Sequence, residues 1–246
     1  MERKYKTKKD PETGLLRIIA LKDFSDVKKG DKGGLIEKET NLSQEGDCWV
    51  YKNAKAWDDA FVSGNARITG DAIISDNARV SGDAEISGNA QVYGHARVFG
   101  NACVCGFAEV SGNAVVFGDA EVYDSARVIG NACVSGNAEI YEKAQISGYV
   151  EIYEKAKIYG NVYVLGEASV EGVAKICGNV KLHSPVNRSF ISLSIKDSKD
   201  YVILAIKKDF YIISLSNNII NQDISIVEEN YINNIKTIRQ LYGKEV

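Results

Sequence analysis

Two histidines, His95 and His183, are the side chains best suited to proton transfer at neutral pH, and the chain has no others. His95 lies in Tyr93-Gly94-His95-Ala96, at a position where neighbouring segments carry Asn or Asp, so it is either a substituted turn residue or a general base. A general base needs an orienting partner and a nearby oxyanion donor, and the sequence indicates neither. His183 comes just before Ser184-Pro185, where the regular pattern ends, and is interpreted as a junction residue.

The five cysteines are odd in number and include no Cys-x-x-Cys pair, so they predict free thiols in a reducing cytoplasm rather than disulfides. They are Cys48, Cys103, Cys105, Cys133 and Cys177. Two histidines cannot supply a three-histidine zinc site, and no Gly-x-x-x-x-Gly-Lys-Ser/Thr phosphate loop is present. We therefore expect neither a metal nor a cofactor.

The segment from Val50 to Leu182 repeats every six residues without an insertion or deletion. In each unit a Val or Ile points inward and the next residue points outward, as a strand requires. Gly followed by Asn or Asp then permits a sharp bend, a small Ala fits inside the corner, and a charged residue faces water. Self-similarity at this short period predicts an all-β solenoid, a parallel β-helix, in which three units form one triangular coil.

Positions eighteen residues apart must then stack above one another, which places aromatic side chains in outward columns. The longest run predicted is Tyr123, Tyr141 and Tyr159, between Cys105 and Cys177. A second column holds Phe99 and Phe117, followed by Ser135 and Tyr153. Such ladders either stabilise the stack alone or present a rigid surface to a partner, since exposed apolar patches mark interaction sites.

The composition changes on both sides of the repeat. Residues 1–13 are basic and polar and predict a flexible tail, whereas 14–49 predict an N-terminal β cap over the first coil, whose unpaired edge must be protected. The repeat occupies residues 50–183. Residues 184–246 predict a small β-β-β-α module, with strands at 190–195, 201–206 and 210–215. Its helix is predicted from a capping box at Ser225 and Glu228, followed by an apolar stripe.

The overall composition is that of an ordinary globular protein. With 246 residues, 26% charged, and a net charge of −3, the chain is not basic enough to predict nucleic-acid binding. No apolar run is long enough to span a membrane, and Met1 to Lys6 contain no signal core. These features predict a cytoplasmic protein.

The pattern Ile/Val-x-Gly-Asn/Asp-Ala-x resembles the hexapeptide-repeat, left-handed β-helix family over more than half of the chain. The segments Arg17 to Phe24, Gly30 to Gly34 and Asn41 to Val50 resemble the first part of YdcK-like proteins, whose relatives occur in bacteria and in phage or prophage genomes. The resemblance implies left-handed winding. Many hexapeptide-repeat enzymes transfer acyl groups with a histidine base, which would imply acetyl-CoA as the cofactor and His95 as the base.

These observations favour a non-catalytic scaffold that binds a macromolecular partner. The predicted binding residues are Tyr123, Tyr141, Tyr159, Phe99, Phe117 and Tyr153, and the partner is another protein or a second copy of the chain in a homo-oligomer. A phage or prophage accessory protein acting on a host component is the setting that the resemblance implies. The alternatives are an acyltransferase that uses acetyl-CoA with His95 as base, and a filament built by end-to-end stacking.

Overall fold

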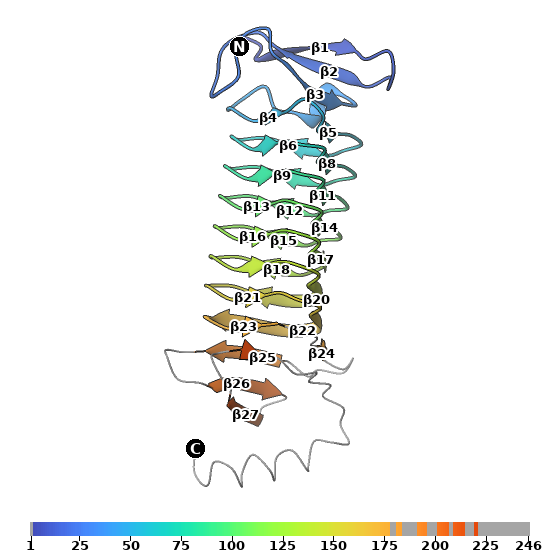
Figure 1. Cartoon of the computed structure of the whole chain (residues 1–246). Coiled ribbons are helices and arrows are strands. Elements are labelled where there is room, and N and C mark those ends of the chain that lie inside the picture. Colours follow the sequence, from blue (N-terminus) through green and yellow to red (C-terminus); the bar gives the residue numbers. More distant parts are fainter. Residues whose placement is uncertain are drawn as a thin grey trace.

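The computed structural model describes residues 2–177, 181–183, 191–195, 201–206, 209–214 and 219–220. Within this part the chain is an all-β solenoid with antiparallel strands at its N-terminal end (Figure 1). It contains no α-helix in these ranges, only the short 3-10 helix η1 (Glu39–Asn41). The predicted helix around Ser225 and Glu228 lies outside the described residues.

The six-residue unit acts as the sequence predicts. The inward β-branched residue and the corner Ala of each unit are fully buried, as Val104 and Ala108 illustrate with 0% exposure each. Most of their outward neighbours are half-buried or exposed, and Ser111, Ser169 and Cys177 are buried exceptions. The interior is thus a continuous column of Val, Ile and Ala, and its burial supplies most of the favourable free energy of this fold.

Three parallel sheets form the sides of the solenoid. We call the first the tyrosine face; it consists of β4 (Trp49–Val50), β7 (Arg67–Ile68), β10 (Glu85–Ile86), β13 (Cys103–Val104), β16 (Glu121–Val122), β19 (Glu139–Ile140), β21 (Lys157–Ile158) and β23 (Lys175–Ile176). The second, the phenylalanine face, consists of β6 (Phe61–Val62), β9 (Arg79–Val80), β12 (Arg97–Val98), β15 (Val115–Val116) and β18 (Cys133–Val134), continued by the second halves of β20 (Gln145–Ile152) and β22 (Tyr163–Gly172).

The third face consists of β5 (Lys55–Ala56), β8 (Ile73–Ile74), β11 (Gln91–Val92), β14 (Glu109–Val110) and β17 (Arg127–Gly130), the first halves of β20 and β22, and β24 (Lys181–His183). On every face a residue pairs with the one eighteen positions later, for example Glu121 with Glu139. Backbone hydrogen bonds hold this register, such as the one from Tyr123 N to Ile140 O at 2.9 Å.

The corners of the coils require glycine where successive turns meet. Gly100 has a φ of 74°, and a Cβ added there would lie 2.9 Å from the backbone N of Gly118 in the next turn. A side chain at this position would be strained both by the left-handed backbone and by the contact. The spacing between coils therefore limits which residues can occupy a corner.

The N-terminal end is covered by a three-stranded cap. Its strands β1 (Tyr5–Lys9), β2 (Leu16–Ala20) and β3 (Lys32–Ile36) form an antiparallel sheet, and β3 continues parallel onto β5. The cap predicted for residues 14–49 is present, but the flexible tail predicted for residues 1–13 is wrong, because β1 pairs along its whole length with β2 and Tyr5 is fully buried. Because this segment is mostly basic and polar, its composition does not indicate that one face of the strand is buried.

Lys4 connects the cap to the first coil. Only 1% of this residue is exposed, and its Nζ donates to the carbonyl oxygens of Gly46 at 3.1 Å and Cys48 at 3.0 Å. The Nζ also lies 5.4 Å from the ring centroid of Phe24, which packs edge-on against Trp49. A buried ammonium is tolerated here because the carbonyls that end the first turn solvate it.

At the other end, strands from beyond the repeat extend the solenoid. β25 (Ile191–Ile195) pairs in parallel with β22, and β26 (Tyr201–Ile206) and β27 (Asp209–Ser214) follow it in antiparallel order. These three strands lie within one residue of the predicted ranges. β28 (Ile219–Ile220) pairs in parallel with β23 and so extends the edge of the tyrosine face.

Among the described residues, no helix is long and apolar enough to cross a membrane.

Replacing Lys4 by Met should destabilise the cap by about 1–3 kcal/mol, because the carbonyl oxygens that the ammonium satisfies would remain buried without a donor. Urea unfolding followed by the fluorescence of Trp49 and Trp57, which lie in the first turns, measures this loss. Lys6→Met is the matched control, since Lys6 lies two residues after Lys4 and is exposed. Equal unfolding midpoints for the two variants would contradict the assignment.

Candidate functional site

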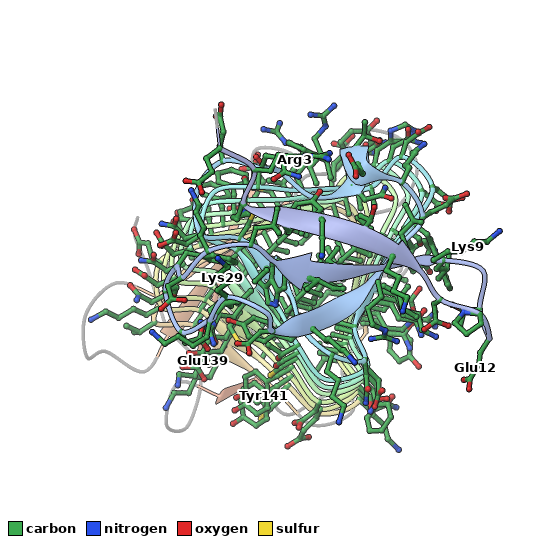
Figure 2. The ribbon with its side chains drawn as sticks, turned by 90° about the horizontal axis from the view of Figure 1, so that it is seen from above. Arg3, Lys9, Glu12, Lys29, Glu139 and Tyr141 are labelled. Carbon is green, nitrogen blue, oxygen red and sulfur yellow. The ribbon has the colours of Figure 1, made fainter. Side chains whose placement is uncertain are left out.

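The predicted tyrosine column is confirmed. Tyr123 and Tyr141 stack with ring centroids 4.8 Å apart and an interplanar angle of 4°, and Tyr141 and Tyr159 stack at 4.7 Å and 5°. The spacing equals that of neighbouring parallel strands, because the backbone register places each ring directly beside the next. We call these three residues the tyrosine ladder. Figure 2 shows Tyr141 pointing outward from the solenoid wall, on the same side as Glu139.

Stacking determines what the ladder offers to a partner. Both faces of the Tyr141 ring are covered by its neighbours, and Tyr123 and Tyr159 are each covered on one face, so the half-buried rings present mainly their edges and hydroxyls. Burial raises the pKa of Tyr123 and of Tyr141. For Tyr159, hydrogen bonding to Cys177 and then burial raise the pKa to about 12. The hydroxyls are therefore protonated at neutral pH and can both donate and accept hydrogen bonds.

Carboxylates border the ladder on both sides. Glu121 and Glu139 occupy the outward positions before Tyr123 and Tyr141, and Asp124 and Glu142 immediately follow these tyrosines. After burial, Glu139 is the largest cause of the raised pKa of both tyrosines. Glu139 binds Lys157 Nζ at 2.6 Å, whereas Glu121 and Glu142 form no ion pair within 4 Å among the described residues.

Asp124 and Glu142 stand at corners that are otherwise occupied mainly by glycine. Both have a φ of 57°, in the left-handed region. A non-glycine residue in this region costs on the order of 1–3 kcal/mol. The chain thus tolerates strained backbone at two positions next to the ladder, and both carry carboxylates.

Phe107 was missed by the sequence analysis. It occupies the corner position that holds Asn or Asp in most units, and 69% of it is exposed. Its backbone N donates to Asp124 O at 2.5 Å, which places it at the end of the ladder beside Tyr123. The departure from Gly-Asn/Asp-Ala in Gly106-Phe107-Ala108 was the available signal. Tyr149, with 65% exposure, departs from the pattern in the same way.

The other predicted aromatic residues lie on the phenylalanine face and do not form one continuous column. Phe99 and Phe117 stack with centroids 5.1 Å apart and an angle of 9°, and the guanidinium of Arg97 lies 5.6 Å from the centre of Phe99. Tyr153 is separated from this pair by Ser135 and donates its hydroxyl to Glu171. The structure thus stacks the two phenylalanines but divides the six predicted binding residues between two faces. The three ladder tyrosines lie on one face, and Phe99, Phe117 and Tyr153 lie on the other.

His95 lies at an exposed corner of the third face. Its backbone N donates to Gly112 O at 2.7 Å, and its imidazole has no hydrogen-bond partner among the described residues. Asp76, which lies below Gly94 in the preceding turn, accepts a hydrogen bond from the backbone N of Gly94 at 2.9 Å. The described residues therefore provide no hydrogen-bond partner that orients the His95 imidazole as a base. His183 ends β24, and its side chain lies outside the described part.

The cysteines are free thiols, as predicted. Burial, and then the neighbouring thiol of Cys105, raise the pKa of Cys103 to about 12, so this thiol is protonated and weakly nucleophilic at neutral pH. Among the described residues, no group of three or more His, Cys, Asp or Glu side chains is arranged to hold a metal ion.

The cap covers the first turn of the tyrosine face. Tyr51 begins the column that leads to the ladder, and its hydroxyl donates to Asp26 at 2.6 Å. Arg67 donates to both carboxylate oxygens of Asp26, at 2.8 and 3.0 Å, and its guanidinium lies 4.9 Å from the ring centre of Tyr51. The later turns of this face carry no cap residues in the described part.

The comparisons with known proteins agree with this geometry. Residues 60–76 and 90–106 match the YdcK β solenoid repeat. Over 47 residues the chain is 53% identical to a protein of Escherichia coli (strain K12) named "Uncharacterized acetyltransferase YdcK". The match covers 19% of this chain and 14% of that protein, so the chain spans a small part of the length of this relative. The match supports a YdcK-like β-solenoid repeat at these two segments, whereas the resemblance at Arg17 to Phe24, Gly30 to Gly34 and Asn41 to Val50, before the repeat, stays a prediction.

The bond network at Asp26 predicts an acid-sensitive cap. The hydrogen bonds from Arg67 and then Tyr51 hold the pKa of Asp26 well below its ordinary value. A lowered folded-state pKa gives stability that is present above the unfolded value, about 4, and is lost as the pH falls below it toward the folded value. Tryptophan fluorescence should therefore show weaker resistance of the cap to urea at about pH 3 than at neutral pH.

Asp26→Asn should weaken the cap at neutral pH and reduce this pH dependence, because the neutral amide cannot form the charged pair. Asp71→Asn is the control, since Asp71 is exposed at a corner. The same pH dependence in wild type and Asp26→Asn would show that other carboxylates are responsible.

Proposed function

We propose that this protein is a non-catalytic scaffold, wound as a left-handed β-helix, that binds a macromolecular partner through the tyrosine face. The observation that carries this proposal is the in-register stacking of Tyr123, Tyr141 and Tyr159 on an outward surface. Tyrosine is enriched among the residues that dominate binding energy at interfaces. Its apolar ring and polar hydroxyl let one side chain supply both contact area and hydrogen bonds.

Preorganisation supports the proposal further. Binding normally costs about 0.5–1.5 kcal/mol for each flexible side chain that it immobilises. The ladder has already fixed its rings by stacking, and the backbone beneath is held by continuous parallel pairing. A partner would therefore meet a surface that loses little conformational entropy on binding.

The partner is a protein or a second copy of this chain. A phage or prophage accessory protein acting on a host component is the setting consistent with the sequence resemblance. End-to-end filaments are disfavoured, because the antiparallel cap covers the first coil and strands from beyond the repeat pair with the last ones.

Replacing Tyr123, Tyr141 and Tyr159 by Ser should weaken association at least tenfold, because the contact area and the hydroxyls are removed together. The loss of two ring stacks should lower the unfolding free energy by only about 0.4–2 kcal/mol. Sedimentation velocity measures self-association, and affinity capture from the native host compares the tagged wild type with the variant.

Phe99→Ser with Phe117→Ser is the matched control, since it removes a stacked pair from another face. A tyrosine variant that loses only stability while its association is unchanged would contradict the proposal. Equal weakening by the phenylalanine variant would move the interface away from the tyrosine face.

The second candidate is an acyltransferase that uses acetyl-CoA with His95 as base. The observation in its favour is the name of the Escherichia coli relative, an uncharacterized acetyltransferase, to which the chain is similar over 47 residues. This function predicts calorimetric binding of acetyl-CoA and loss of acetyl transfer in His95→Asn, a change that restores the usual corner residue. Absence of any heat of binding would remove this candidate.

A further inference from the structure

The charge around the tyrosine ladder distinguishes it from the other aromatic surface. On the phenylalanine face, Arg97 lies 5.6 Å from the centre of Phe99, and Arg79 pairs with Arg97 in the neighbouring strand. On the tyrosine face, the residues next to Tyr123 are Glu121 and Asp124. The first aromatic surface thus has a cation against its ring, whereas Tyr123 is bordered by carboxylates, and Lys157 of the tyrosine face is paired with Glu139.

The end of the ladder at Tyr123 has an additional feature. The next residue in the column is Cys105, because Cys103 and Val104 pair with Glu121 and Val122. A cysteine side chain is much shorter than a tyrosine side chain, so the outer part of one face of the Tyr123 ring extends beyond its neighbour. Phe107, which is 69% exposed, follows Cys105 by two residues, and its backbone N donates to Asp124 O at 2.5 Å.

An open aromatic face between carboxylates is suited to a planar cation. The face of an aromatic ring carries negative electrostatic potential, and a guanidinium stacks on it while its N–H groups donate to carboxylates. Among the described residues Glu121 forms no ion pair within 4 Å, because the nearby Lys157 binds Glu139 directly and interacts with Glu121 only at longer range. Asp124 accepts a hydrogen bond from Glu142 N at 3.2 Å through Oδ2, and its other carboxylate oxygen has no hydrogen-bond donor among the described residues.

We propose that the tyrosine face binds an extended, arginine-rich segment of a protein partner, with one guanidinium stacked on the open face of Tyr123 beside Phe107 and between Glu121 and Asp124. The remaining length of the segment follows the ladder past Tyr141, where Glu142 offers a further carboxylate. This inference rests on the proposed function, since it names the chemistry of the partner for the same surface.

The test uses the full chain and a fluorescein-labelled peptide of alternating Arg and Ser, with binding followed by fluorescence anisotropy. Two comparison peptides replace Arg by Lys or by Glu. We expect the Arg peptide to bind several-fold more tightly than the Lys peptide, because ammonium groups neither stack nor bind in a bidentate manner. The Glu peptide should not bind, and added salt should weaken the Arg peptide.

Two variants test the proposed guanidinium site at Tyr123. Glu121→Gln with Asp124→Asn should weaken the Arg peptide roughly tenfold through the loss of both charges. Phe107→Asn should weaken it to a similar extent, and it restores the usual Gly-Asn-Ala corner, so folding is maintained.

The matched control is Glu151→Gln with Glu154→Gln. Glu151-Ile152-Tyr153-Glu154 has nearly the same local sequence as Glu121-Val122-Tyr123-Asp124, and the φ of Glu154 is also positive, at 60°. Tyr153 lies on the phenylalanine face and belongs to no ladder. The control should bind the Arg peptide as the wild type does.

Equal weakening by the control pair would show general attraction to an acidic surface and would overturn the inference. Equal binding of the Arg and Glu peptides, or no binding of either peptide, would also overturn it. The two proposals fail separately. If the Tyr→Ser variant loses its native association but peptide binding does not follow Glu121, Asp124 and Phe107, the interface stands and its chemistry is different. If the peptide behaves as expected but native association survives in the Tyr→Ser variant, the proposed function fails.

Discussion

The pairing of each residue with the one eighteen positions later is the constraint on which the rest of the structure depends. It is maintained on three faces by backbone hydrogen bonds between successive turns. Because these bonds fix the spacing, every outward position forms a column whose members are about 4.8 Å apart. Stacked aromatic rings need nearly this separation, so a Tyr repeated in register becomes a ladder without any further adjustment of the backbone.

The same constraint determines what the corners can carry. Glycine is favoured where the turns approach closely, yet Asp124 and Glu142 adopt the left-handed conformation next to the ladder. The corner position after the glycine is freer, since it points outward, and there Phe107 replaces the usual Asn or Asp. Variation that has little effect on folding is therefore concentrated at the corners and at the outward strand positions. These positions together give each face its chemical character.

The ends of the solenoid are handled differently from its middle. Lys4, Tyr5 and Trp49 form a small core that joins an antiparallel cap to the first coil, and Asp26 fastens a cap loop to Tyr51 and Arg67. At the opposite end, β25 and β28 continue the parallel pairing with residues from beyond the repeat. Both arrangements protect strand edges that would otherwise pair with other chains. The binding that we propose is therefore assigned to the lateral faces.

The sequence by itself determined the solenoid, its register and the membership of the columns, because a six-residue period leaves a single pattern of inward Val, Ile and Ala. It also predicted an N-terminal β cap within residues 14–49, where the strands Leu16–Ala20 and Lys32–Ile36 lie. Tertiary structure decided the features that the six-residue period does not describe. The basic segment at Tyr5–Lys9 became a strand because one of its faces packs on the first coil, where Tyr5 is fully buried. Periodicity specifies the register and hence the neighbours within each column, whereas the packing of the non-repeating cap depends on contacts that only the folded chain establishes.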